Sequence, residues 1–180
     1  MKRTGQSKRS ESASTFDLIG KVMDDDSPLP GIEVLSVNSI DEVVSRIPRR
    51  HKYFTLLLAW DAPDIPRSDL IRLVRPLVNN CLAYFCAWGE GCEEVHDAVD
   101  LADLEREREF GESDYFQMTT WHKNEPLDDA VWFFKHCAIP AEEHVLADWE
   151  RFAVSVGNPA WKDRIVDSLS RVEVEEEEGE

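Results

Sequence analysis

Two cysteines and two histidines have the types and spacing that a metal site requires. Cys92 and His96 are four residues apart, so they share one face if their segment is helical. Cys86 precedes them at the end of an apolar run, and His122 ends the next run. Two thiolates and two imidazoles form a tetrahedral zinc set. The spacing Cys-x5-Cys-x3-His matches no standard zinc finger, so the indication of zinc is weak and no other cofactor is expected.

The same segment also suggests a thiol nucleophile. Cys92 opens a predicted helix, where the helix dipole lowers the pKa of a thiol. His96 or His122 would act as the base, and Asp61 or Asp97 would orient it. Negative charge beside Cys92 opposes this, because it raises the pKa again. The acidic neighbours are Glu90, Glu93 and Glu94. The alternative is that the cysteines are small buried apolar residues, so whether the protein is an enzyme stays open.

Tryptophan recurs where apolar runs end, and polar residues follow it. The segments are Ala59-Trp60-Asp61, Ala87-Trp88-Gly89-Glu90, Thr120-Trp121-His122 and Gly157-Asn158-Pro159-Ala160-Trp161. In a parallel sheet these ends lie along one edge, which is where open α/β sheets bind ligands. We therefore predict a set of ligand-binding residues at this edge: Trp60, Trp88, Thr120, Trp121 and Asn158. The alternative is that the indoles fill the ends of the hydrophobic core.

Short apolar runs alternate with amphipathic segments along the body of the chain. The predicted strands are residues 32–37, 53–60, 81–88, 115–121 and 152–156. The predicted helices are residues 39–47, 70–78, 90–108, 127–137 and 161–169. This alternation indicates βαβ units with right-handed crossovers. We expect a three-layer α/β fold with a mostly parallel sheet of four or five strands and helices on both faces.

Composition divides the chain into a body and two polar ends. We predict a disordered basic segment and linker over residues 1–31, a single α/β domain over 32–171 and a disordered acidic tail over 172–180. The start is polar and lacks the apolar stretch of a signal peptide. We therefore expect a cytoplasmic protein whose four cysteines are reduced.

The charge balance excludes several classes of partner. The 180 residues include 20 basic and 37 acidic side chains, a formal charge of −17, and residues 13–172 alone carry −14. Nucleic acids and anionic membranes attract proteins of the opposite sign.

The sequence also lacks the patterns of several other classes of protein. No apolar run approaches the roughly 20 residues of a membrane span. Neither a phosphate-binding glycine loop nor a Gly-x-Ser-x-Gly motif occurs.

Two functional hypotheses follow from these patterns. The first is a non-enzymatic protein-interaction or regulatory module that binds a basic protein through its acidic surface. The acidic residues of the segment 97–109 would supply that surface. The alternative is a ligand-binding or catalytic site at the carboxyl edge of the sheet, with a thiol, a histidine or a metal as its reactive group.

The body of the chain resembles a bacterial family of small proteins known only as a domain of unknown function. The residues that carry the resemblance are Ala59-Trp60-Asp61, Cys86-Ala87-Trp88-Gly89, Cys92-Glu93-x-Val95-His96-Asp97, Thr119-Thr120-Trp121-His122, Leu127-Asp128-Asp129-Ala130-Val131-Trp132-Phe133 and Gly157-Asn158-Pro159-x-Trp161. The resemblance implies a bacterial protein. It implies no activity and assigns no catalytic role to any residue.

Overall fold

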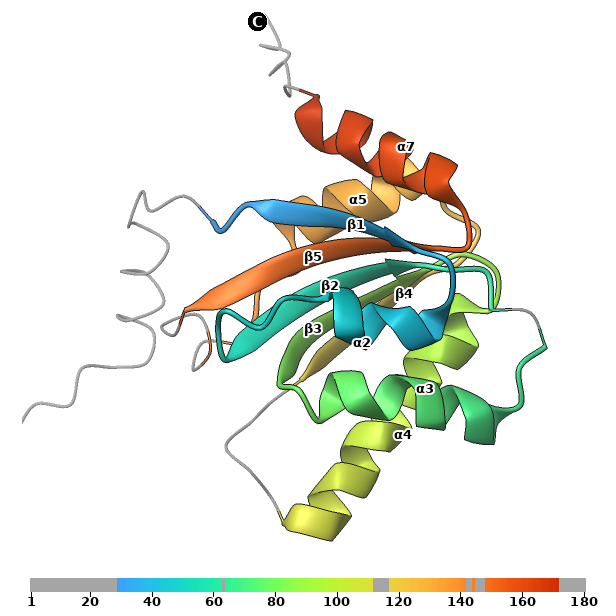
Figure 1. Ribbon diagram of the computed structural model, residues 1–180, viewed down its shortest axis with the longest axis vertical. Helices are drawn as coiled ribbons and strands as arrows, with labels where there is room; N and C mark the ends of the chain where they lie inside the picture. Colours follow the sequence, from blue (N-terminus) through green and yellow to red (C-terminus); the bar gives the residue numbers. More distant parts are fainter. Residues whose placement is uncertain (1–28, 63, 112–116, 142–143, 145–147, 172–180) are drawn as a thin grey trace, which may run out of the picture.

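A five-stranded sheet lies between two layers of helices in the computed structural model of the protein (Figure 1). The structure describes residues 29–62, 64–111, 117–141, 144 and 148–171. Most of the predicted N-terminal segment and the predicted acidic tail, residues 1–28 and 172–180, lie outside the described residues.

All five strands are parallel, and the sheet order is β1-β5-β2-β3-β4. The strands are β1 (Ile32–Val37), β2 (Tyr53–Ala59), β3 (Leu82–Trp88), β4 (Met118–His122) and β5 (Trp149–Val156). The last strand of the chain thus lies between the first two. β5 is buried along its whole length, because it has a strand on each side and helices on both faces.

The helices divide between the two faces of the sheet, as Figure 1 shows. One face carries η1 (Ile40–Glu42), α2 (Val43–Arg46), α3 (Arg67–Val78) and α4 (Cys92–Phe110). The other face carries α5 (Leu127–His136) and α7 (Pro159–Ser170). Side chains of a strand alternate between these two cores, so that Leu56 and Leu58 face α3 and α4 while Leu57 and Ala59 face α5. The predicted three-layer α/β fold is confirmed.

Two helices each leave a large apolar side chain exposed. Leu104 of α4 is 50% exposed and Val166 of α7 is 45% exposed. The buried face of α4 includes the small residues Cys92, Ala98 and Ala102. These let α4 lie close to the sheet and to α3, and the large Leu104 is turned to the outside. Among the described residues, no helix has the length and apolar character needed to cross a membrane.

Candidate functional site

The carboxyl ends of β1, β5 and β2 surround an open hollow of about 500 Å³. Its lining residues are Asn38, Ser39, Ile40, Trp60, Asp61, Ile65, Val156, Gly157, Asn158 and Trp161. The topology creates this hollow. β5 leads into α7 on one face of the sheet, whereas its neighbours β1 and β2 lead into helices on the other face. Loops that diverge at such a switch point leave a crevice, the usual ligand site of open α/β sheets.

Asp61 is fixed at the rim of this hollow by the neighbouring strand. The backbone N–H of Trp60 donates to the carbonyl of Trp88 at 2.9 Å, so the pairing of β2 with β3 continues beyond β2. Asp61 Oδ1 then accepts the backbone N–H of Glu90 at 2.8 Å. Trp60 is buried, with 8% of its surface exposed. Trp60 therefore fills the end of the core, while the exposed Asp61 directs a carboxylate toward the hollow.

Asn158 forms the opposite wall, at the start of α7. Its Oδ1 accepts the backbone N–H of Ala160 at 3.1 Å and caps the helix. This bond uses the side-chain oxygen, so the amide NH₂ is the group that a ligand would meet. Trp161 follows on the first turn and packs edge-to-face against Trp88, with ring centroids 5.2 Å apart. An indole, an amide and a carboxylate thus converge on one hollow.

His122 lies at the other half of the same edge, away from the lining of the hollow. It is buried, its Nδ1 lies 2.8 Å from Glu125 Oε2, and its ring packs on Phe133. Its Nε2 is buried without a hydrogen-bond partner. The pair has the form of a histidine oriented by a carboxylate, but burial raises the pKa of the nearby Cys92 thiol, which makes it a poor nucleophile.

His96 is held by side chains of α4 and β4. Its Nε2 lies 2.9 Å from Thr119 Oγ1, and its Nδ1 lies 3.3 Å from Asp97. Its ring packs on the half-exposed indole of Trp121, with centroids 4.5 Å apart. Thr119 also donates to Asp100 at 2.8 Å. The polar atoms of His96 are therefore engaged in fixing α4 to the edge strand.

The two cysteines of the predicted metal set lie on opposite faces of the sheet. Cys92 belongs to the core under α3 and α4, and Cys86 to the core under α5. Burial raises the pKa of both thiols, that of Cys86 to about 12, although Thr120 donates to Cys86 Sγ at 3.2 Å. Both are protonated near pH 7. Among the described residues, no group of three or more His, Cys, Asp and Glu side chains is arranged to hold a metal ion.

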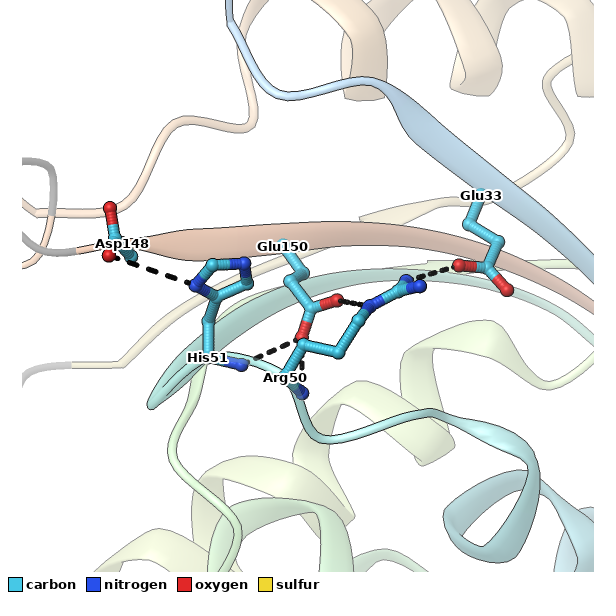
Figure 2. Close-up of polar contacts among 5 residues, drawn as sticks. All are labelled: Glu33, Arg50, His51, Asp148 and Glu150. Atoms are coloured by element: carbon cyan, nitrogen blue, oxygen red, sulfur yellow. Dashed lines mark hydrogen bonds and ion pairs between the residues drawn. The ribbon is translucent and has the colours of Figure 1, made fainter.

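The amino edge of the sheet carries a compact ionic cluster, which Figure 2 shows. Glu150 accepts the side chain of Arg50 at 2.6 Å and the backbone N–H groups of Arg50 and His51 at 2.9 and 3.0 Å. Arg50 also contacts Glu33 at 2.5 Å, and His51 lies 4.0 Å from Asp148. Every group here has a partner, so the cluster fixes the loop before β2 to β5 and leaves no free reactive group.

Apart from the cysteines, most of the predicted site residues thus divide into two groups. The structure brings Trp60, Asp61 and Asn158 together around the hollow, and Trp88 adjoins it through Trp161. It places Thr120, Trp121 and His122 on β4, with His96 of α4 beside them, outside the hollow. Sequence reasoning missed the contribution of β1. Asn38, Ser39 and Ile40 line the hollow because β1 is the other neighbour of β5, and only the strand order reveals this.

An all-parallel α/β domain with a crevice at its switch point defines the structural class of the protein. A family model described as a domain of unknown function, DUF7684, matches residues 34–172. The chain belongs to this family, which confirms that the resemblance drawn from the sequence was to a domain of unknown function. Searches of curated proteins and of solved structures find no match.

Proposed function

We propose that the protein binds a small polar molecule in the hollow at the carboxyl ends of β1, β5 and β2. The observation that carries the proposal is the position of this hollow at the switch point of the sheet. Its volume of about 500 Å³ falls within the range of small-molecule sites. Apolar walls from Ile40, Ile65 and Val156 alternate with a few polar groups, which is the usual composition of such a site.

The polar groups indicate the chemistry of the ligand. Asp61 supplies acceptor oxygens and one negative charge, and Asn158 supplies amide donors. Trp161 supplies a flat apolar surface. This set suits a molecule with hydroxyl or amine groups and one flat or apolar side, such as a nucleoside or a sugar. It disfavours an acid, because a carboxylate ligand would meet Asp61.

The test is a ligand-observed NMR screen followed by calorimetric titration of the compounds that bind. The panel contains nucleosides, monosaccharides and amino acids. The variant Asn158→Asp retains the helix cap, since aspartate caps as well as asparagine, but loses the amide donors. We expect at least a tenfold loss of affinity, the effect of about one hydrogen bond, with a nearly unchanged melting temperature.

The matched control is Asn79→Asp, which adds the same charge at the end of α3, outside the hollow. It should bind the same compounds with the affinity of the unmodified chain. Binding that survives Asn158→Asp would place the site elsewhere. Failure of the whole panel to bind would contradict the proposal.

A second candidate function is the interaction module with a basic partner. Residues 92–110 hold eight acidic and two basic side chains, a formal charge of −6. Several carboxylates are already matched, since Asp103 pairs with Arg106 and Glu105 with Arg75. The observation that favours this function is the exposure of two large apolar side chains on the same helix. Leu104 is 50% exposed and Phe110 is 73% exposed. We propose that a basic segment with apolar side chains would cover the exposed side of α4 around Leu104.

The test compares capture of a cellular partner by the unmodified chain and by Leu104→Asp at low and physiological salt. We expect the variant to lose the partner, and the unmodified chain to bind several-fold more weakly at physiological salt. Val166→Asp is the matched control, because Val166 is similarly exposed on α7 at the other face. A partner retained by Leu104→Asp, or one indifferent to salt, would contradict this candidate.

We further propose that the protein works in the cytoplasm of a bacterial cell. The support is the state of its cysteines: Cys81, Cys86, Cys92 and Cys137 are all free thiols. Free cysteines, two of them fully buried, are typical of a reducing compartment. Fractionation of the source cells would test the location directly.

A further inference from the structure

Arg151 is a buried cation on the face of β5 that α5 and α7 cover. Only 3% of its surface is exposed. One terminal nitrogen donates to the carbonyl oxygens of Phe134 and Lys135 at the end of α5, the latter at 2.9 Å. The guanidinium also lies over the ring of Phe134, 5.2 Å from its centroid. Carbonyl dipoles attract a cation but carry no full charge, and no carboxylate of the described residues pairs with Arg151.

Two polar atoms beside this guanidinium lack partners. Arg151 Nε and Thr55 Oγ1 are buried without a hydrogen bond. The two residues lie directly opposite each other in the pairing of β5 with β2, so their side chains share one face of the sheet. Buried polar groups are nearly always hydrogen-bonded, and an exception calls for an explanation such as an additional group at that place.

Two neighbouring ionisable groups, Tyr84 and Cys86, supply no negative charge. Burial raises the pKa of Tyr84, opposite Thr55 on β3, to about 12. Burial likewise raises the pKa of Cys86 to about 12. Both are neutral near pH 7. Burial lowers the pKa of Arg151 to about 10, which still leaves it protonated. The interior under α5 therefore holds a positive charge for which the described residues supply no counter-ion.

Arg151 reaches the surface through an open hollow of about 400 Å³ at the amino edge of the sheet. The start of β1 at Ile32 and the end of α7 at Leu169 form two of its walls. Lys135 and His136 of α5 also line it, so three basic residue types surround the hollow in a protein of net charge −17. This hollow lies at the opposite edge of the sheet from the one lined by Asp61.

We propose that this hollow binds a carboxylate group, which pairs with Arg151 at its base and with Lys135 on its wall. A guanidinium presents a fork of N–H donors that matches the two oxygens of a carboxylate. Two kinds of molecule offer such a carboxylate. One is a small free acid. The other is a glutamate of residues 173–178, which follow Leu169 closely in the sequence.

The experiment measures the melting temperature of two proteins, the full chain and a chain that ends at Arg171. Each is measured in sodium succinate and in sodium chloride of equal ionic strength. Succinate at about ten times its Kd should raise the melting temperature by about 3 °C above the chloride value. A rise in both proteins identifies a free acid as the occupant. A rise in the shortened chain alone identifies the glutamates. No rise in either protein overturns the proposal.

Arg151→Met tests whether the guanidinium is the binding group. Methionine fills the space of the arginine stem and removes the unpaired charge, so the variant is expected to fold. It should abolish the response to succinate. Arg151→Lys is the second variant. It retains the charge without the fork of N–H donors and should weaken the binding of succinate at least tenfold. Lys162→Met, an exposed charge on α7, should leave the response intact. A response that survives in Arg151→Met, or that Lys162→Met also removes, overturns the proposal.

Discussion

Glu150 shows how one residue sets both the geometry and the pH range of the fold. Burial alone would raise the pKa of this carboxyl. Hydrogen bonds from the Arg50 side chain and from the backbone N–H groups of Arg50 and His51 outweigh burial, so the pKa lies below its usual value of 4.5. The loop before β2 is therefore held to the centre of the sheet by a charged carboxylate (Figure 2).

We predict that Glu150→Gln lowers the free energy of unfolding at pH 7 by about 1 to 2 kcal/mol. The pKa of Glu150 is lowered in the folded state, so its contribution to stability is complete above pH 4.5 and is lost as the pH falls through the native pKa. Urea unfolding between pH 7 and pH 3 measures this. The unmodified chain should lose more stability over the acidic part of this range than the variant does.

Glu33→Gln provides the comparison, since Glu33 contacts the same guanidinium with its side chain 40% exposed. Exposed ion pairs contribute little, so the loss should be much smaller. Equal losses from the two substitutions would mean that the burial of Glu150 and its backbone hydrogen bonds are irrelevant to its contribution.

At the scale of elements, the spacing of apolar residues predicted the strands and helices, because apolar side chains are buried in the folded protein. The segment 53–60 is apolar without alternation, and β2 is indeed covered on both faces. The ends were predicted less well. The helix predicted over residues 70–78 begins earlier, at Arg67, and runs through Pro76 to Val78.

The sequence predicted which residues lie at the edge of the sheet, but not which of them meet in the hollow. Trp60, Asp61 and Asn158 follow strand ends, and a parallel sheet necessarily places them at one edge. Whether they meet depends on strand order. The insertion of β5 between β1 and β2 results from pairing between residues that are 119 and 96 positions apart in the chain, which no local pattern encodes.

The turn from β3 into α4 depends on a glycine. Gly89 has φ +117°, and an added Cβ would lie 2.4 Å from the carbonyl oxygen of Trp60. We predict that Gly89→Ala lowers the free energy of unfolding by about 2 kcal/mol or more, because both the backbone conformation and the contact with Trp60 must change. Chemical denaturation measures the loss.

Gly111→Ala is the matched control. Gly111 has φ +88° at the end of α4, and an added Cβ would meet nothing within 4 Å. It should cost only the backbone strain, roughly 1 kcal/mol. Were the two substitutions equally destabilising, the close approach of β2 to this turn would contribute nothing to stability.

At the scale of the whole molecule, charge is unevenly distributed along the fold. Residues 43–81, which include α3, hold seven basic and three acidic side chains, whereas residues 82–148 hold four basic and seventeen acidic side chains. The ion pair of Arg75 with Glu105 joins the two regions across α3 and α4. The net negative charge of residues 82–148 is far larger than the net positive charge of residues 43–81. Over the whole molecule, repulsion between carboxylates therefore outweighs the attraction of the ion pairs.

We predict that salt stabilises the protein at neutral pH. Raising sodium chloride from about 20 to 300 mM shortens the screening length from roughly 20 Å to below 8 Å, which weakens repulsion between distant carboxylates more than contacts at ion-pair distance. The melting temperature measured by calorimetry should rise by a few degrees. Near pH 4.6, the isoelectric point calculated from the sequence, the net charge vanishes and the rise should disappear. A melting temperature that falls with salt at pH 7 would show that ion pairs such as Glu150 with Arg50 dominate, and the same salt series on Glu150→Gln would then lose that fall.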